Sequence, residues 1–453
     1  MILLMTILFV MGYICIAMEH PLKVNKAAIA LMLSAILWTI YIFAASTFEW
    51  NKGIEIDKLI EQIVDIQITT HIGEIAEILF FLMGAMTIVE LVDVHGGFSI
   101  ITDKIKTKSK RKLLWTIGLI TFILSAILDN MTTAIVITML LRKLVDDKQD
   151  RLIFASIVIL AANAGGAFSP IGDVTTIMLW IGGQVTSQGI IPTLFLPSLI
   201  SIVVPLILAS RYVKGTVGVL SSNSLETHSH PASLVITSKE RSSIFLLGVG
   251  ALIFVPIFKS ITHLPPFIGI LFGLSVLWVY TEILYHRKSN VEESRKARIT
   301  HILSRIDIST ILFFLGILMA VAALREAHIL KDFSVLLNEN IGNLYIINII
   351  IGLLSSVVDN VPLVAGAMGM YNVIPGSIEF GQNGIFWVFL AYCAGVGGSI
   401  LIIGSAAGVV VMGLEKINFI WYMKRISLIA LLGYLAGAAF YIFEMQIIFP
   451  LLN

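Results

Sequence analysis

Long apolar runs dominate the chain, and many of them reach the ~20 residues that a helix needs to cross a bilayer. The runs are continuous and do not alternate with polar residues, which favours helices over the strands of a membrane barrel. One run contains the stretch LDNMTTAIV at 128–136, which places an acid, an amide and two hydroxyls among apolar neighbours. The pattern predicts a polytopic helical membrane protein with a polar break inside one apolar segment.

The basic residues indicate how the segments are oriented, because Lys and Arg gather in cytoplasmic loops. The segments 103–112 and 142–151 are both basic, yet a single apolar stretch separates them. A hairpin that enters from the cytoplasm and returns, with its tip at Asp129-Asn130, satisfies both. Non-helical backbone at that depth must be buried in protein or face a watery cavity. The acid-rich segment 47–70 is predicted to be an external loop.

The chain repeats its own motifs. The stretch LSAILDNMTTAIV (124–136) matches LSSVVDNVPLVAG (354–366), and the glycine pattern of NAGGAFSPIGD (163–173) recurs in GVGGSILIIGS (395–405). The second hairpin is flanked by 374–383, which has no Lys or Arg, so it opens to the outside and the repeats are predicted to be inverted, a frequent plan in secondary transporters. The predicted parts are a first repeat 1–214 with hairpin 113–145 and broken helix 151–185, a polar cytoplasmic linker 215–241, and a second repeat 242–453 with hairpin 343–373 and broken helix 384–414.

Composition supports the membrane class and narrows the function. The chain is 57% hydrophobic and 13% charged, with a mean hydropathy of +0.95, which is too apolar for a water-soluble protein of this length. The formal net charge of +1 gives no indication of nucleic-acid binding. Cys15 and Cys393 lie in apolar segments and cannot form a disulfide framework. The motifs of a membrane hydrolase are missing from the sequence, so a transporter without a cofactor is predicted, and not an enzyme.

Acids inside apolar segments are the candidate functional residues, because an ionised Asp at mid-membrane costs about 2.5–3.5 kcal/mol on insertion scales. Asp129, Asp173 and Asp359 are three such acids, and each needs compensation. Simpler interpretations stay open beside an ion site. An Asp-Asn pair can cap the next helix, Asp173 can cap 174–184, Asn163 can serve the backbone, Ser399 and Ser405 can be packing residues, and Glu77 can lie at the membrane interface.

Four motifs resemble those of the NhaD-type sodium/proton antiporters of the ion transporter superfamily: LDNMTTA, NAGGAFSPIGDVTT, VVDNVPL and the opening GYICIAMEHPLKVNKAA. The resemblance runs from the first helix to the last. It implies a fold like that of the dicarboxylate/sodium symporters, with two hairpins that meet two broken helices, a scaffold that dimerises, and a transport domain that moves against it. One departure is Thr132-Thr133 after the first tip against Pro362-Leu363 after the second, which weakens the case for two equivalent ion sites.

The resemblance also assigns residues. Those that match the ion-binding and coupling positions are Asp129, Asn163, Asp173, Asp359 and Asn360, and those in the same motifs are Asn130, Thr132 and Ser355. Further candidates are Thr133, Ser399, Ser405 and Glu77. Sodium is a hard cation that favours oxygen ligands, and the expected ligands for Na⁺ are Asp129, Asn163, Asp173 and Asp359, with freed backbone carbonyls beside them.

We therefore expect a secondary antiporter that exports sodium, or lithium, in exchange for protons by alternating access. A buried carboxylate can hold a proton or a sodium ion but not both well, which couples the two fluxes. A homodimer in the bacterial inner (plasma) membrane is expected, with an organelle envelope as the alternative location. The competing functions are a sodium-coupled dicarboxylate symporter, which the two tip acids disfavour by repelling an anion, and an oxyanion or arsenite exporter of the same superfamily.

Overall fold

The computed structural model describes residues 1–48, 51–52, 55–98, 100, 107, 109–216, 236–288 and 302–448. Apart from one isolated bridge between Ser109 and Thr216, these residues form helices and the turns between them. Most of the predicted linker 215–241 and much of the basic segment 103–112 lie outside the described residues.

The described helices divide between the two halves of the chain. In the first half they are α1 (Ile2–Ala17), α2 (Glu19–Leu22), α3 (Lys26–Ala44), α4 (Ile56–Glu61), α5 (Thr69–Val94), α7 (Lys110–Leu128), α8 (Asn130–Leu144), α9 (Lys148–Ala167), α10 (Val174–Ile181) and α11 (Ser187–Ala209). In the second half they are α12 (Ser238–Thr262), α13 (Pro266–His286), α15 (Ile308–Glu326), α16 (Ile329–Asn340), α17 (Leu344–Ser355), α18 (Asn360–Met370), α19 (Ile385–Gly397), α20 (Ala406–Glu415), α21 (Phe419–Arg425) and α22 (Ser427–Phe443).

The helices have the length and composition of membrane spans. Within the described residues, nine are long and apolar enough to cross a bilayer, and α20 and α21 form a further pair bent by 113°. Many of their large apolar side chains are exposed, such as Phe43 at 78% and Ile261 at 73%, which suits contact with lipid. The prediction of an all-α polytopic membrane protein is confirmed, whereas the division into inverted repeats stays a prediction.

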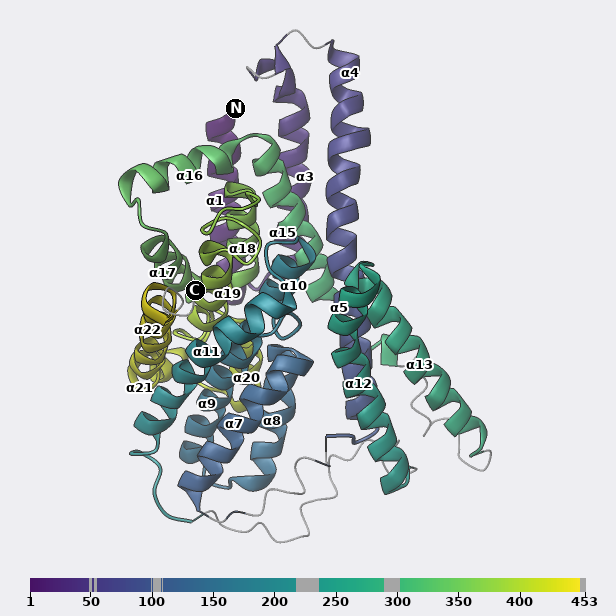
Figure 1. Cartoon of the computed structure of the whole chain (residues 1–453), viewed down its shortest axis with the longest axis vertical. Coiled ribbons are helices and arrows are strands. Elements are labelled where there is room, and N and C mark those ends of the chain that lie inside the picture. Colours follow the sequence, from purple (N-terminus) through teal and green to yellow (C-terminus); the bar gives the residue numbers. More distant parts are fainter. Residues whose placement is uncertain are drawn as a thin grey trace.

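Two groups of helices pack beside each other (Figure 1). The α3–α15 group contains α1, α3, α5, α12, α13 and α15, and in Figure 1 α12 and α13 extend away from the rest of the molecule. The α9–α19 group contains α7, α8, α9, α11, α17, α19, α20 and α22. The short helices α10 and α18 lie where the groups meet, because α10 contacts both α5 and α19, and α18 contacts both α15 and α19.

Four helix breaks lie next to polar residues, and each following helix is capped by the side chain at the break. Asp129 accepts from Thr132 at the start of α8, and Asp359 accepts from Val361 at the start of α18. Asp173 begins α10 with a capping box, and Ser405 caps α20 through Gly408. The interpretation of the Asp-Asn pairs and of Asp173 as caps is therefore confirmed, although α10 ends at Ile181 and not at 184.

The predicted external loop 47–70 is wrong in its second half. The chain is helical from Ile56 through α4, a π-helical segment at Gln62–Ile68 and the start of α5. Apolar residues recur there at helical spacing, with Leu59 and Ile63 both buried. Three of the acids that indicated a loop, Asp57, Glu61 and Asp65, lie on exposed positions of this helix.

Candidate ion-binding site

The tip of the first hairpin reaches the first broken helix through one amide. The Nδ2 atom of Asn130, the first residue of α8, donates to Asp173 Oδ2 at 2.9 Å and to Asn163 Oδ1 at 3.1 Å. Asn163 lies in the last turns of α9, and Asp173 lies just before α10. All three side chains are buried. The prediction that these breaks meet is therefore supported by direct contacts between their polar residues.

The tip of the second hairpin reaches the same carboxylate from the other half of the chain. The Nδ2 atom of Asn360 donates to Asp173 Oδ2 at 3.2 Å and to Asp173 Oδ1 at 3.5 Å. Asp173 Oδ1 also accepts from the backbone N–H of Thr175 at 3.1 Å. Asp173 thus lies between the two tip amides and takes its hydrogen bonds from neutral donors.

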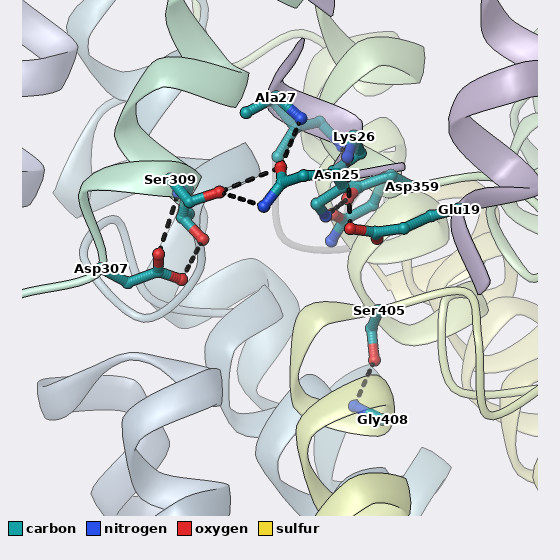
Figure 2. A network of polar contacts seen from close by, with 12 residues as sticks. Glu19, Asn25, Lys26, Ala27, Asp307, Ser309, Asp359, Ser405 and Gly408 are labelled. Carbon is teal, nitrogen blue, oxygen red and sulfur yellow. Dashed lines mark hydrogen bonds and ion pairs between the residues drawn. The ribbon is translucent and has the colours of Figure 1, made fainter. Parts of the chain in front are cut away.

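The break before α20 is connected to the same site through the hydroxyl of Ser405. Asn163 Nδ2 donates to Ser405 Oγ at 2.9 Å. Ser405 Oγ also accepts from Gly408 N at 3.1 Å, as Figure 2 shows. Ser405 is therefore linked to the site and is more than a packing residue. The central cluster is the connected set Asn130, Asn163, Asp173, Asn360 and Ser405, with one member or more from each of the four breaks.

The two tip acids flank this cluster in different ways. Asp129 has a φ of 88°, and both of its oxygens accept from Thr132, the Oδ1 from N–H at 2.9 Å and the Oδ2 from Oγ1 at 2.7 Å. Asp359 Oδ2 instead forms an ion pair with Lys26 Nζ at 3.0 Å. Each tip acid directly precedes the asparagine whose amide bonds Asp173. Two acids and one ammonium therefore lie beside a buried polar centre that contains a third acid, and a mobile cation there would reduce the repulsion among the carboxylates.

Comparisons with known proteins identify the family of the chain. A family model described as a citrate transporter matches residues 13–389. Sodium/proton antiporter 2 of Arabidopsis thaliana is 42% identical over 97% of this chain and 98% of its own length, and sodium/proton antiporter 1 of that plant is 44% identical over 97% and 72%. The Na⁺/H⁺ antiporter NhaD of Vibrio parahaemolyticus is 32% identical over 80% of this chain and 88% of its own length. The chain belongs to the NhaD-type sodium/proton antiporter family.

Membership of the NhaD-type family confirms two predictions from the sequence. The family model and the relatives are transporters, so the chain is a transporter and not an enzyme. The apolar helices and the bacterial NhaD relatives agree with a multi-pass inner-membrane protein. The homodimer, the use of lithium and the lack of a cofactor stay predictions.

Several candidates from the sequence lie outside the central cluster of this NhaD-type chain. The hydroxyl of Ser355 donates to Ala394 O at 2.8 Å and ties α17 to α19, as Ser125 ties α7 to α9 through Ala162 O at 2.5 Å. Ser399 donates to Val396 O in the same turn, which suits a packing role.

Glu77 and Thr133, two further candidates from the sequence, are not hydrogen-bonded to the central cluster. Glu77 lines a separate cavity of about 500 Å³, together with His71, Glu74 and Arg325. In the described part of the chain, the buried hydroxyl of Thr133 has no hydrogen-bond partner among the protein atoms.

Sequence reasoning missed Lys26. It lies 333 positions from Asp359, and the only local signal is a lysine at the beginning of an apolar run, in the segment VNKAAIA. A charged residue next to a membrane span is ordinarily interpreted as a topology signal. Only the packing of α3 beside α15, and of α15 beside α18, brings this lysine to the second tip.

Proposed function

We propose that the chain exports sodium in exchange for protons by alternating access, with the ion bound at the central cluster and the neighbouring acid Asp129. The observation that carries the proposal is the position of Asp173 between the tip amides of Asn130 and Asn360. Helix breaks at the interface of two repeats are typical of ion sites in secondary transporters, because they free backbone carbonyls and aim helix ends at the ion. The names of the relatives, sodium/proton antiporters, support this choice of ion.

The side chains of the central cluster can serve the site both without sodium and with sodium bound. Each Asn carries an N–H donor group and a carbonyl oxygen on the same amide. In the structure, the amides of Asn130 and Asn360 donate to Asp173 and stabilise its carboxylate. A half-turn of each amide would present its oxygen, so the residues that stabilise the carboxylate without sodium can also ligate sodium.

Capping and ion binding are compatible. A carboxylate has about four lone-pair positions. Asp129 and Asp173 each use some of them for caps at the starts of α8 and α10. The cap fixes the orientation of the carboxylate and leaves positions for a cation. Because a bound cation disfavours a proton on that carboxylate, sodium and protons compete for it, and this competition couples the two fluxes.

The test is exchange in vesicles. We expect Asp129→Asn, Asp173→Asn and Asp359→Asn each to lower sodium-dependent proton flux, with the largest loss for Asp173, because it is the buried carboxylate that both tip amides bond. Everted vesicles with a pH-sensitive dye measure the flux after sodium is added to an imposed proton gradient. Asp146→Asn, an exposed acid between α8 and α9, is the matched control and should exchange normally. Normal exchange in all three site variants would contradict the proposal.

The description of the matching family model as a citrate transporter favours one second function, sodium-coupled uptake of a carboxylate substrate. The carboxylate of Asp173 in the cluster and the carboxylates of the two tip acids beside it oppose this function, because they repel an anionic substrate. The same vesicles distinguish the two functions. Sodium alone should dissipate the proton gradient, and citrate or succinate should add nothing. Sodium-driven uptake of labelled citrate or succinate, with no effect of sodium alone on the gradient, would favour the symporter.

A further inference from the structure

The ammonium of Lys26 occupies the position at the second tip that a hydroxyl occupies at the first. At the first tip, Thr132 Oγ1 donates to Asp129 Oδ2 at 2.7 Å. The matching position after Asp359 is Pro362, whose side chain has no donor. Lys26 Nζ instead donates to Asp359 Oδ2 at 3.0 Å. One carboxylate oxygen thus has a neutral partner at the first tip and a cationic partner at the second.

The surroundings of Lys26 hold the ammonium at this point. Its Nζ lies 4.3 Å from the ring centre of Phe313, and its backbone N–H donates to Glu19 Oε1 at 3.2 Å (Figure 2). Asn25 caps α3 directly before it and bonds Ser309 of α15. The side chain is only 26% exposed, and that of Asp359 is 16% exposed. The pair is therefore sheltered enough from water to be stronger than a surface ion pair.

The pair also ties the α3–α15 group to a helix at the boundary between the two groups. Lys26 begins α3, which packs on α1 and α15 in the α3–α15 group. Asp359 begins α18, which lies where the groups meet, next to the Asn360 that bonds Asp173. Any movement of the second tip away from α3 has to break this ion pair.

We propose that Lys26 is a tethered cation that competes with sodium for Asp359. This inference rests on the proposed function and deepens it. A carboxylate oxygen that holds an ammonium at contact distance cannot hold a sodium ion there as well, since the two cations would repel each other. Asp359 is thus neutralised by the chain itself when sodium is absent, and sodium binding at the second tip releases Lys26. The two tips are therefore unequal, with Asp129 open to ions and Asp359 reached only by displacing a lysine.

Two substitutions test the competition in opposite directions. Lys26→Gln removes the competing charge, so the sodium concentration for half-saturation should fall by roughly threefold or more, the effect expected of a sheltered ion pair. Lys26→Arg strengthens the competitor, because a guanidinium can bind a carboxylate through two N–H groups, so that concentration should rise. Lys23→Gln, an exposed lysine three residues earlier, is the control and should leave it unchanged.

The measurement is sodium binding to the purified protein, followed as the rise in melting temperature with NaCl at constant ionic strength kept with choline chloride. Half-saturation that is unchanged or raised in Lys26→Gln would overturn the competition. If this variant does not fold, Lys26→Arg decides alone, and an unchanged or lowered half-saturation overturns it. The double variant Lys26→Gln with Asp359→Asn should match Asp359→Asn, because the lysine acts through that acid. Loss of flux in the Asp129 and Asp173 variants tests the proposed function separately.

Discussion

Two glycines set how closely each hairpin approaches its broken helix. A Cβ atom at Gly165 of α9 would overlap the carbonyl of Phe122 in α7, and one at Gly397 of α19 would overlap the carbonyl of Gly352 in α17. Both obstacles are backbone atoms of packed helices, which cannot rotate away as a side chain can. Small residues at such crossings let helices in membranes pack backbone to backbone.

Gly165→Ala and Gly397→Ala should therefore destabilise the protein by about 1–3 kcal/mol each, the usual cost of overpacking. The hairpin arm must shift, and the tip that contacts Asp173 shifts with it, so exchange should fall together with stability. Thermal melting of the purified variants measures the first effect and vesicle flux the second. Gly250→Ala on α12 is the control, because a Cβ there meets nothing within 4 Å. Melting of Gly165→Ala like this control would contradict the argument.

A buried acid ties three elements together beyond the central cluster. Glu415, the last residue of α20, has a side chain that is 2% exposed and accepts from Arg142 Nε and Arg151 Nε, both at 2.7 Å. Arg142 also donates to Leu414 O. One carboxylate thus holds the end of α8 and the start of α9 against the end of α20, at the base of the first hairpin.

Glu415→Gln should lower the stability of the protein by about 1–3 kcal/mol, because the buried side chain loses its charge-assisted hydrogen bonds to two arginines that are themselves partly exposed. Thermal melting in detergent measures the change, with Glu339→Gln on the exposed face of α16 as the control. Sodium half-saturation should stay near that of the unmodified protein, since Glu415 is not bonded to the cluster. A melting temperature equal to that of the control would rule out a structural role for this acid.

The elements that sequence predicts well carry local signals. A polar pair inside an apolar run indicates each tip, and a Gly and Pro interruption indicates the break between α9 and α10. The contact between the tips and Asp173 was predicted only through the family resemblance. The ion pair of Lys26 with Asp359 was missed because it depends on packing between distant segments, and the direction of the Ser355 hydroxyl, toward Ala394 O, depends on packing in the same way. The prediction of a loop was wrong at 56–68, because acids on one face of a helix were interpreted as a loop signal.

At the scale of the whole molecule, the two halves use the same contacts at matching positions. Ser125 with Ala162 O corresponds to Ser355 with Ala394 O, and each pair joins a hairpin to its broken helix. The glycine contacts of α9 and α19 correspond in the same way. These matches support the proposed repeat. Whether the two halves are inverted depends on the side of the membrane from which each hairpin enters. In an inverted repeat, the loop after the first hairpin and the loop after the second lie on opposite sides of the membrane.

Labelling of introduced cysteines tests that arrangement. Gln149 is exposed at the start of α9, after the first hairpin, and Ile378 is 79% exposed between α18 and α19, after the second. With Cys15 and Cys393 replaced by Ser and Ala, a membrane-impermeant maleimide should label Ile378→Cys in intact cells and Gln149→Cys in everted vesicles, because charged loops place the first hairpin's base in the cytoplasm. Permeabilised cells, in which both cysteines should react, give the control for accessibility. Labelling of both from one side would show that the two hairpins enter from the same side of the membrane, which would contradict the predicted inverted repeat.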